Sequence, residues 1–239
     1  MEYKLKVLGS GSSGNGYIID GNKEALIMEL GCKFDEYLKA LDYDMSRVVG
    51  CVVSHRHTDH IRKDTLEKFL KYNIPVFGND DVRELYNKVQ PLPTPLFLGD
   101  FRVKHFDLIH NVQNTAYVID MMNGARLLFA TDTVMIPKIV KNVNIALVEA
   151  NYDEDIIVQN AMEGIENRSQ FFNHHSIERC IEYLSKLDHK CLCSVILCHL
   201  SGNNSNKSVF TKRVKETLGF ENVFVAERNS CFILEGEEF

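Results

Sequence analysis

The stretch VVSHRHTDHI, residues 52–61, places three histidines and an aspartate within six positions, directly after an apolar run. These residues are His55, His57, Asp59 and His60. Residues two apart in an extended segment project to the same side, so His55 and His57 can converge on one cation. Asp59 and His60 follow a turn and face another direction, where they can hold a second cation. The stretch therefore predicts a metal site at the end of a buried strand.

The composition is that of an ordinary globular chain, with 45% hydrophobic and 25% charged residues among 239. This length buries a substantial core, and no repeat or linker divides it, so we expect one domain over residues 1–239. No apolar run approaches the ~20 residues that a membrane-spanning helix needs, and the first residues lack a signal-peptide layout. We therefore expect a cytoplasmic protein with no membrane partner.

The net charge bears on the class of binding partner, and the cysteines bear on the redox state of the thiols. The formal net charge is −6, and the densest basic segment, TKRVKE, reads as one solvated helix face. Proteins that grip long DNA or RNA usually carry a basic stripe, which makes such a partner less favoured here. The seven cysteines sit mostly in apolar runs and lack C-x-x-C spacing, so we expect reduced thiols.

Short β-like runs alternate with turns and helical patterns along the chain. The helical patterns are Phe34–Leu41, Asp64–Tyr72, Asp80–Val89, Ser176–Leu187 and Ser205–Leu218. Asp80 and Ser176 are the expected N-caps of their helices. Two β-rich halves, each followed by helices, predict an α+β fold in which two packed sheets carry helices on their outer faces, a four-layer αββα sandwich.

The stretch GSGSSG, residues 9–14, matches the G-x-G-x-x-G pattern of dinucleotide-binding loops. That pattern is meaningful only where it opens a helix, whose N-terminus meets the pyrophosphate. Here it runs into YIID, a strand pattern. We therefore expect a tight hairpin at this position.

SHRHTDHI resembles the H-x-H-x-D-H motif of the metallo-β-lactamase superfamily, whose fold is an αββα sandwich. LIHN, LLFATDT and VILCHLS fit the family's remaining metal motifs, and each lies just after a β-like run. The resemblance implies two groups of metal ligands joined by a bridging aspartate: His55, His57 and His110; Asp59, His60 and His199; and Asp132 between them. Two divalent cations per chain are expected, Zn²⁺ first and Mn²⁺ as the alternative.

One departure from the family pattern and two unassigned histidines remain. LIMELG offers Glu29 where the family usually has Asp, a residue that supports the metal loop, so the longer side chain changes the geometry of that support. His105 and His189 fit no motif, and we interpret both as structural.

Two further motifs resemble the RNase Z branch of the superfamily. LVEAN places Glu149 where that branch has the glutamate of H-E-A-T, and NHHSIERCIEYL resembles its G-H-S-T segment, which aligns His174 with the histidine. The resemblance implies that Glu149 orients His174, which protonates the leaving oxygen of a phosphodiester. Asp59 joins them as a catalytic residue through the metal motif, and His175 is the less favoured alternative to His174.

The chain also resembles YycJ-like proteins over almost its full length, through GSGSSGNG, VEAN, NHHS and HLSGNN. Bacterial YycJ is associated with DNA exonuclease activity, whereas the similar phage anti-Pycsar proteins hydrolyse cyclic mononucleotides. The chain has Gly202 where the HLSREN segment usually carries Arg, which favours a small substrate. Ser176 and Asn203 are the expected substrate-binding residues.

The leading hypothesis is a two-metal phosphodiesterase for a small nucleotide, first a cyclic mononucleotide, of the phage anti-defence type. The alternative is a DNA or RNA nuclease of the YycJ or RNase Z type, whose binding would depend steeply on salt. A thioester or β-lactam hydrolase is disfavoured by Glu149 and His174. A structural metal site is disfavoured because such a site needs only four ligands.

Enclosing a small substrate requires a lid, and two segments are candidates. One is QPLPTPLFLGD, residues 90–100, and the other is YDEDIIVQNAMEGIENRSQ, residues 152–170. We expect Ile156, Ile157 and Val158 to be exposed and to form a homodimer contact beside the partner's metal site. The alternative is an amphipathic helix packed on its own core.

Overall fold

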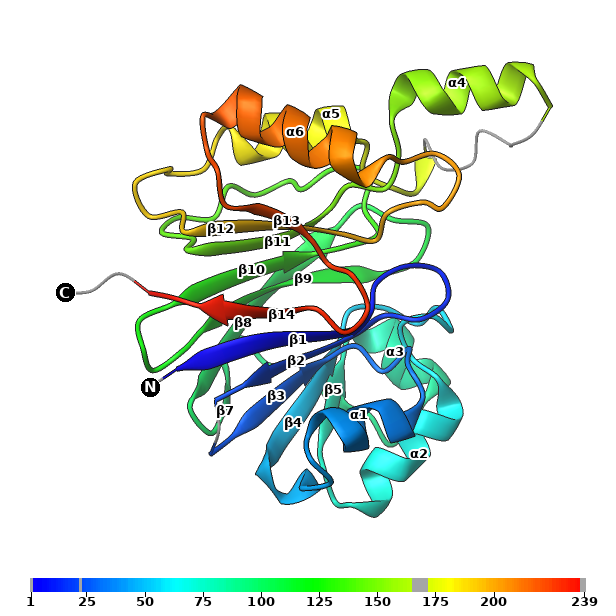
Figure 1. Cartoon of the computed structure of the whole chain (residues 1–239). Helices are drawn as coiled ribbons and strands as arrows, with labels where there is room; N and C mark the ends of the chain where they lie inside the picture. Colours follow the sequence, from blue (N-terminus) through cyan, green and yellow to red (C-terminus); the bar gives the residue numbers. More distant parts are fainter. Residues whose placement is uncertain (1, 22, 165–171, 237–239) are drawn as a thin grey trace.

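The computed structural model describes residues 2–21, 23–164 and 172–236, which form two seven-stranded sheets packed face to face (Figure 1). The first sheet contains, in order, β14 (Cys231–Leu234), β1 (Tyr3–Gly9), β2 (Gly16–Asp20), β3 (Ala25–Met28), β4 (Val48–Val53), β5 (Val76–Gly78) and β6 (Gln90–Pro91). The second contains β13 (Val223–Val225), β12 (Ser194–Cys198), β11 (Ile145–Glu149), β10 (Arg126–Ala130), β9 (Asn114–Asp120), β8 (Phe101–Leu108) and β7 (Leu96–Leu98).

Helices cover the outer face of each sheet, which confirms the αββα sandwich (Figure 1). They are α1 (Phe34–Ala40), α2 (Lys63–Lys71), α3 (Asp80–Leu85), α4 (Glu154–Met162), α5 (Ile177–Leu184) and α6 (Lys207–Leu218), with the 3-10 turn η1 at Met45–Arg47. None of the helices in the described part of the chain is long and apolar enough to cross a membrane.

The core has three layers because central strands bury both faces. Successive side chains of a strand point to opposite sides, so Leu147 of β11 joins the core between the sheets while Val148 joins the core beneath α5 and α6. Tyr17 and Phe129 meet edge to face between the sheets, with ring centroids 5.3 Å apart. The third layer of the core lies between the first sheet and its helices, and it includes Phe69 of α2.

Strand direction decides where the site forms. β3 and β4 are parallel neighbours, and so are β10, β11 and β12. The carboxyl ends of parallel strands lie at one edge of a sheet, and this is where open α/β sheets bind their ligands. Each metal-type motif follows one of these ends or the end of β8, so a single edge of the sandwich collects them.

All five expected helices are present, with corrections at their ends. α3 ends at Leu85 and not at Val89, and its N-cap is Asn79 and not Asp80, because the side chain of Asn79 accepts the N–H of Val82 at 3.1 Å. Ser176 is confirmed as the N-cap of α5, where its hydroxyl accepts the N–H of Arg179 at 3.3 Å.

The GSGSSG stretch belongs to a hairpin, as expected. β1 and β2 pair antiparallel on either side of it, and β2 follows directly, without a helix. The loop between them spans residues 10–15, which is longer than a tight two-residue turn. All seven cysteines are free thiols, and Cys32, Cys51, Cys180 and Cys198 are buried.

For the two candidate lids, one expectation is corrected and the other stays a prediction. Residues 90–100 cross from one sheet to the other, and Leu96 and Leu98 are buried between the sheets. Leu98 lies against Gly50, the third residue of β4. Ile157 is buried and not exposed, because it lies on the inward side of α4, while its neighbours are half-buried. Residues 165–170 of the second segment lie outside the described residues.

Candidate metal centre

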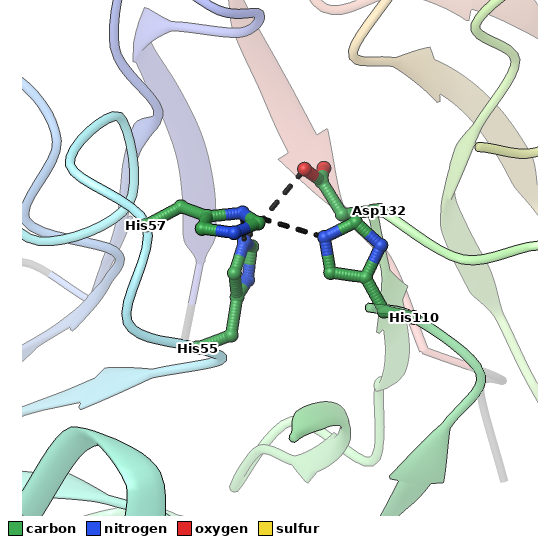
Figure 2. Close-up of side chains that lie close together, drawn as sticks. All are labelled: His55, His57, His110 and Asp132. Carbon is green, nitrogen blue, oxygen red and sulfur yellow. Dashed lines mark hydrogen bonds and ion pairs between the residues drawn. The ribbon is translucent and has the colours of Figure 1, made fainter. Parts of the chain in front are cut away.

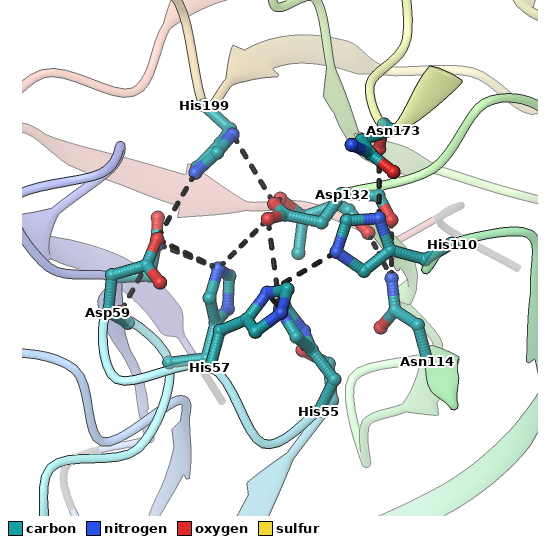
Figure 3. A network of polar contacts seen from close by, with 12 residues as sticks. His55, His57, Asp59, His110, Asn114, Asp132, Asn173 and His199 are labelled. Atoms are coloured by element: carbon teal, nitrogen blue, oxygen red, sulfur yellow. Dashed lines mark hydrogen bonds and ion pairs between the residues drawn. The ribbon is translucent and has the colours of Figure 1, made fainter. Parts of the chain in front are cut away.

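The edge of the sandwich gathers the predicted ligand residues into two clusters that share Asp132. Within each cluster one nitrogen or oxygen atom per residue lies within 4.8 Å of the others. The clusters are His55, His57, His110 and Asp132; and Asp59, His60, His199 and Asp132. The structure thus brings together all seven residues implied by the sequence resemblance. Figure 3 labels all of them except His60.

The first cluster converges around His57 (Figure 2). Its Nδ1 lies 3.0 Å from Nε2 of His55 and 3.4 Å from Nε2 of His110. Oδ2 of Asp132 is 3.7 Å from Nε2 of His55. Ligand atoms around a tetrahedral cation with bonds of ~2.05 Å are ~3.3 Å apart, so these spacings fit one Zn²⁺-sized ion.

The second cluster shows the same spacing. Nε2 of His60 lies 3.4 Å from Oδ2 of Asp132 and 3.5 Å from Oδ2 of Asp59. Nε2 of His199 lies 3.6 Å from the same Asp59 oxygen, and it is a buried atom without a hydrogen-bond partner among the described residues. A buried nitrogen left in this way fits a metal ligand. Asp132 belongs to both clusters, so its carboxylate is placed to bridge two cations.

In several of these histidines, the ring nitrogen that faces away from the cluster contacts another residue. Nδ1 of His55 lies 2.9 Å from the hydroxyl of Ser54, and Nδ1 of His110 lies 2.9 Å from the backbone oxygen of Asn173. Nδ1 of His60 lies 3.2 Å from Oε2 of Glu29, so the longer Glu reaches the metal loop. Partners of this kind fix ring orientation at metal sites.

Three residues of the site have left-handed backbone conformations. Glu29, Asp132 and His199 have φ angles of 67°, 52° and 53°, and each directly follows or lies one residue beyond a strand. Such conformations cost about 1–3 kcal/mol for non-glycine residues and cluster at functional sites. Asp132 and His199 belong to the clusters, and Glu29 contacts His60.

Glu149 connects the metal centre to His174. Its Oε1 lies 2.7 Å from Nδ1 of His174 and 3.1 Å from Nδ1 of His199. Its Oε2 accepts the backbone N–H groups of Thr133 and His175, at 2.9 and 3.2 Å. The carboxylate is fully buried, whereas 20% of the His174 side chain is exposed. The pair expected from the resemblance is therefore assembled, with the imidazole open to a ligand.

The histidines of the two clusters differ in the direction of their pKa shifts. Burial lowers the pKa values of His55, His57 and His110, so these rings are neutral. Burial also acts to lower the pKa of His60 and His199, but neighbouring carboxylates, Asp132 first, outweigh it. They raise the pKa of His199 to about 10 and that of His60 well above its usual range. A cation entering the second cluster must therefore displace protons.

The pKa of His174 is raised, unlike the pKa values of the histidines in the first cluster. Burial acts to lower the pKa of His174, but the charge of Glu149 and the hydrogen bond to it raise the pKa overall. Burial likewise acts to raise the pKa of Glu149, and His174 and His199 lower it overall. His174 therefore keeps its proton to higher pH than an ordinary histidine, which suits a general acid.

The expected substrate-binding residues occupy different places. Ser176 is fully buried, and its hydroxyl is used by the start of α5 and by Glu154 at 2.8 Å, so we correct its role to helix capping. Asn203 is exposed in the loop after β12, and its role stays a prediction. Nδ1 of His175 lies 3.2 Å from the backbone oxygen of Val134, and the ring is buried.

Of the two unassigned histidines, His189 fits a structural role. Its Nε2 lies 3.0 Å from the backbone oxygen of Leu184, the last residue of α5. His105 lies in β8 opposite Tyr117, five residues before His110.

Three asparagines near the ligands were not predicted. Nδ2 of Asn15 lies 2.9 Å from Nε2 of His60 and donates to the backbone oxygen of Asp59 at 3.2 Å. Asn114 donates to the backbone oxygen of Asp132 at 2.6 Å, and Asn151 to that of His199 at 2.7 Å. Each hydrogen bond joins distant chain segments. Asn15 and Asn151 lie in the quoted stretches GSGSSGNG and VEAN, but those stretches do not indicate these contacts.

The fold and the two predicted ligand clusters define a protein of the metallo-β-lactamase type. The chain belongs to the beta-lactamase superfamily, whose domain model matches residues 35–199, more than half of the sequence. It is 26% identical over 176 residues to exodeoxyribonuclease YycJ of Bacillus anthracis and 24% identical over 176 residues to exodeoxyribonuclease WalJ of Streptococcus pneumoniae. The matches cover 66% and 65% of this chain and the same shares of the relatives, which is just under two thirds of each.

Solved structures share the fold. The metallo-β-lactamase fold protein YhfI from Bacillus subtilis has a TM-score of 0.76 at 18% identity, covering 98% of this chain and all of that one. A diphosphatase of the PhnP family has a TM-score of 0.69 at 14% identity, with the same coverage. The short form of human tRNase Z has a TM-score of 0.64 at 12% identity, covering 96% of this chain and 98% of that one.

Proposed function

We propose that the protein is a two-metal phosphodiesterase that cleaves a small nucleotide, with cyclic mononucleotides as the first substrate class. The contact between Glu149 and His174, at the rim of the metal clusters, carries this proposal. A leaving alkoxide needs a proton, whereas a purely structural metal site needs no acid. The net charge of −6 favours a small ligand over a long nucleic acid.

The chain's own groups divide the work as follows. When bound, two divalent cations would polarise the phosphoryl oxygens and lower the pKa of an attacking water. His174 holds a proton on Nε2 while Nδ1 faces Glu149, and it donates that proton to the leaving oxygen. Asp59 contributes through the second cluster, where it holds His60 and His199 in place.

A second candidate is an exonuclease that removes nucleotides from a nucleic-acid end. The curated relatives, named as exodeoxyribonucleases, favour this candidate. Incubation of the metal-loaded protein with cyclic mononucleotides, cyclic dinucleotides and single- and double-stranded DNA separates the two. The first candidate predicts turnover of a cyclic mononucleotide at least tenfold faster than release of nucleotides from DNA. Faster release from DNA would replace it with the second.

We also propose a homodimer, with the segment between Glu149 and His174 at the subunit contact. Met162 and Phe172 are 78% and 74% exposed, which is unusual for large apolar side chains. Sedimentation at micromolar concentration should give twice the chain mass. A monomer with full activity would remove this proposal and leave the phosphodiesterase assignment untouched.

A further inference from the structure

The loop between β1 and β2, residues 10–15, has the sequence SGSSGN and has no task in the proposed function. Three of the predicted ligand residues belong to the second cluster alone: Asp59, His60 and His199. Asp59 and His60 follow β4 of the first sheet, whereas His199 follows β12 of the second. The parts of this cluster therefore come from different sheets, and the β1–β2 loop contacts both.

Ser10 holds the backbone of His199. Its hydroxyl oxygen accepts the backbone N–H of His199 at 2.9 Å, across 189 positions of the sequence. The same oxygen accepts the hydroxyl of Tyr17 at 2.9 Å, and Tyr17 is fully buried in the core between the sheets. His199 has a left-handed φ of 53°, and its backbone oxygen accepts Nδ2 of Asn151 at 2.7 Å. Side chains thus hold both backbone polar groups of a strained residue, which stabilises the conformation that the cluster requires.

Asn15, which is fully buried, holds the other part of the cluster. Its backbone N–H donates to the backbone oxygen of Asp59 at 2.7 Å, and its Nδ2 donates to the same oxygen at 3.2 Å. Nδ2 also lies 3.4 Å from Oδ2 of Asp59 and 2.9 Å from Nε2 of His60. The amide is fixed in turn, because its Oδ1 accepts the backbone N–H of Gly11 at 2.8 Å. Asn15 therefore contacts predicted ligand atoms as well as the backbone that carries them.

The loop lies against the segment that carries Asp59 at a distance that only glycine permits. A Cβ on Gly31 would overlap the backbone oxygen of Asp59 and would lie 2.7 Å from the backbone nitrogen of Asn15. A Cβ on Gly14, whose φ is 141°, would lie 2.5 Å from the backbone oxygen of Gly31. Packing this close leaves little room for the loop to shift, so Asn15 is held firmly against Asp59.

The first cluster has other partners. In the described part of the chain, no hydrogen bond joins residues 10–15 to His55, His57 or His110. Nδ1 of His55 contacts Ser54, and Nδ1 of His110 contacts the backbone of Asn173. Direct hydrogen bonding between the loop and the predicted ligands is therefore confined to the second cluster.

We infer that Ser10 and Asn15 are positioning residues, which set the affinity of the second cluster for its cation and leave the first cluster unaffected. Removal of a residue that orients a metal ligand typically lowers metal affinity about 10–100-fold. Ser10 acts on His199 and Asn15 on Asp59 and His60, so the loss of either residue should weaken the same site. The inference rests on the two-cation centre of the proposed function, but it does not depend on the substrate.

The test is titration of the full-length, metal-free protein with Co²⁺, followed through the visible absorption of the bound ion. Two background variants separate the sites, because Asp59→Asn keeps the ligands of the first cluster and His57→Ala keeps those of the second. In the His57→Ala background, Ser10→Ala and Asn15→Ala should each weaken Co²⁺ binding by about 10–100-fold. In the Asp59→Asn background, the same two changes should leave Co²⁺ binding as it was.

Two further variants serve as comparisons. Ser10→Thr keeps the hydroxyl and should restore the binding that Ser10→Ala loses. Ser12→Ala, at an exposed position of the same loop, is the matched control and should change nothing. Circular dichroism checks the fold of each variant, and Ser10→Ala carries the test alone if Asn15→Ala does not fold.

Equal weakening in both backgrounds would mean a general loss of structure and would overturn the inference. Unchanged binding by Ser10→Ala in the His57→Ala background would overturn it as well. A wild-type protein that binds two Co²⁺ ions but cleaves no phosphodiester would remove the proposed function alone. A wild-type protein that binds no Co²⁺ would overturn both.

Discussion

Nδ1 of His174 lies 2.7 Å from Oε1 of Glu149, and the same oxygen lies 3.1 Å from Nδ1 of His199. One buried carboxylate therefore contacts both a predicted metal ligand and the proposed acid. The other oxygen of Glu149 is held by two backbone N–H groups, which fixes the carboxylate without another side chain. This arrangement ties the position of the acid to the position of the metals.

Metal content provides the first prediction. Each chain should bind two divalent cations, Zn²⁺ or Mn²⁺, because each cluster offers four ligand atoms, with Asp132 common to both. Elemental analysis after metal-supplemented expression should find two equivalents. Asp132→Asn should lower the content of both sites, whereas Asp59→Asn should affect one. No more than trace metal in the wild-type protein would contradict the assignment.

The second prediction concerns pH. In the metal-free protein His60 and His199 are protonated at neutral pH, since neighbouring carboxylates raise both pKa values, that of His199 to about 10. A metal must displace these protons, so affinity for the second cation should rise with pH between 6 and 9. Calorimetry in buffers of different ionisation enthalpy should detect proton release. An affinity that does not change with pH over this range would rule out this reading.

Glu149→Gln should change the pH–rate profile as well as the rate. The charge of Glu149 raises the pKa of His174, so its removal should lower that pKa. The proton on His174 would then be lost at lower pH, and the basic limb of the profile should move to lower pH. Glu182→Gln, an exposed carboxylate on α5, serves as the control. An unmoved basic limb in the Glu149 variant would argue against the pairing.

Ser176→Ala should reduce stability and leave substrate affinity unchanged. The hydroxyl caps α5, and loss of an N-cap costs about 1 kcal/mol. Chemical denaturation should show the loss, and KM should equal that of the wild type. A raised KM with unchanged stability would restore the substrate-binding role expected from the sequence.

The sequence predicts which residues gather at the candidate metal centre but not the contacts that support them. His55, His57, Asp59 and His60 stand together in one loop, so their spacing is visible in the chain itself. By contrast, Asn15 reaches Asp59 across 44 positions, and no local pattern reports such a contact.

Backbone geometry and burial account for the other differences. The left-handed conformations at strand ends depend on the surrounding packing and not on residue type, since the residues concerned are Glu, Asp and His. The apolar run at Ile157 within acidic surroundings predicts an exposed subunit contact, whereas α4 turns Ile157 inward. In the same way, Leu96 and Leu98 lie in the inner core although the surrounding stretch is rich in proline.

The most direct test of the phosphodiesterase account compares leaving groups in His174→Ala. With an unactivated nucleotide substrate this variant should retain both metals and lose about 10²–10⁴-fold in kcat/KM, the usual worth of a positioned general acid. With bis-p-nitrophenyl phosphate, whose leaving group needs no proton, the loss should be less than tenfold. His175→Ala should lose little on either substrate. Equal losses on both substrates in His174→Ala, with both metals still bound, would contradict the role of His174 as the acid.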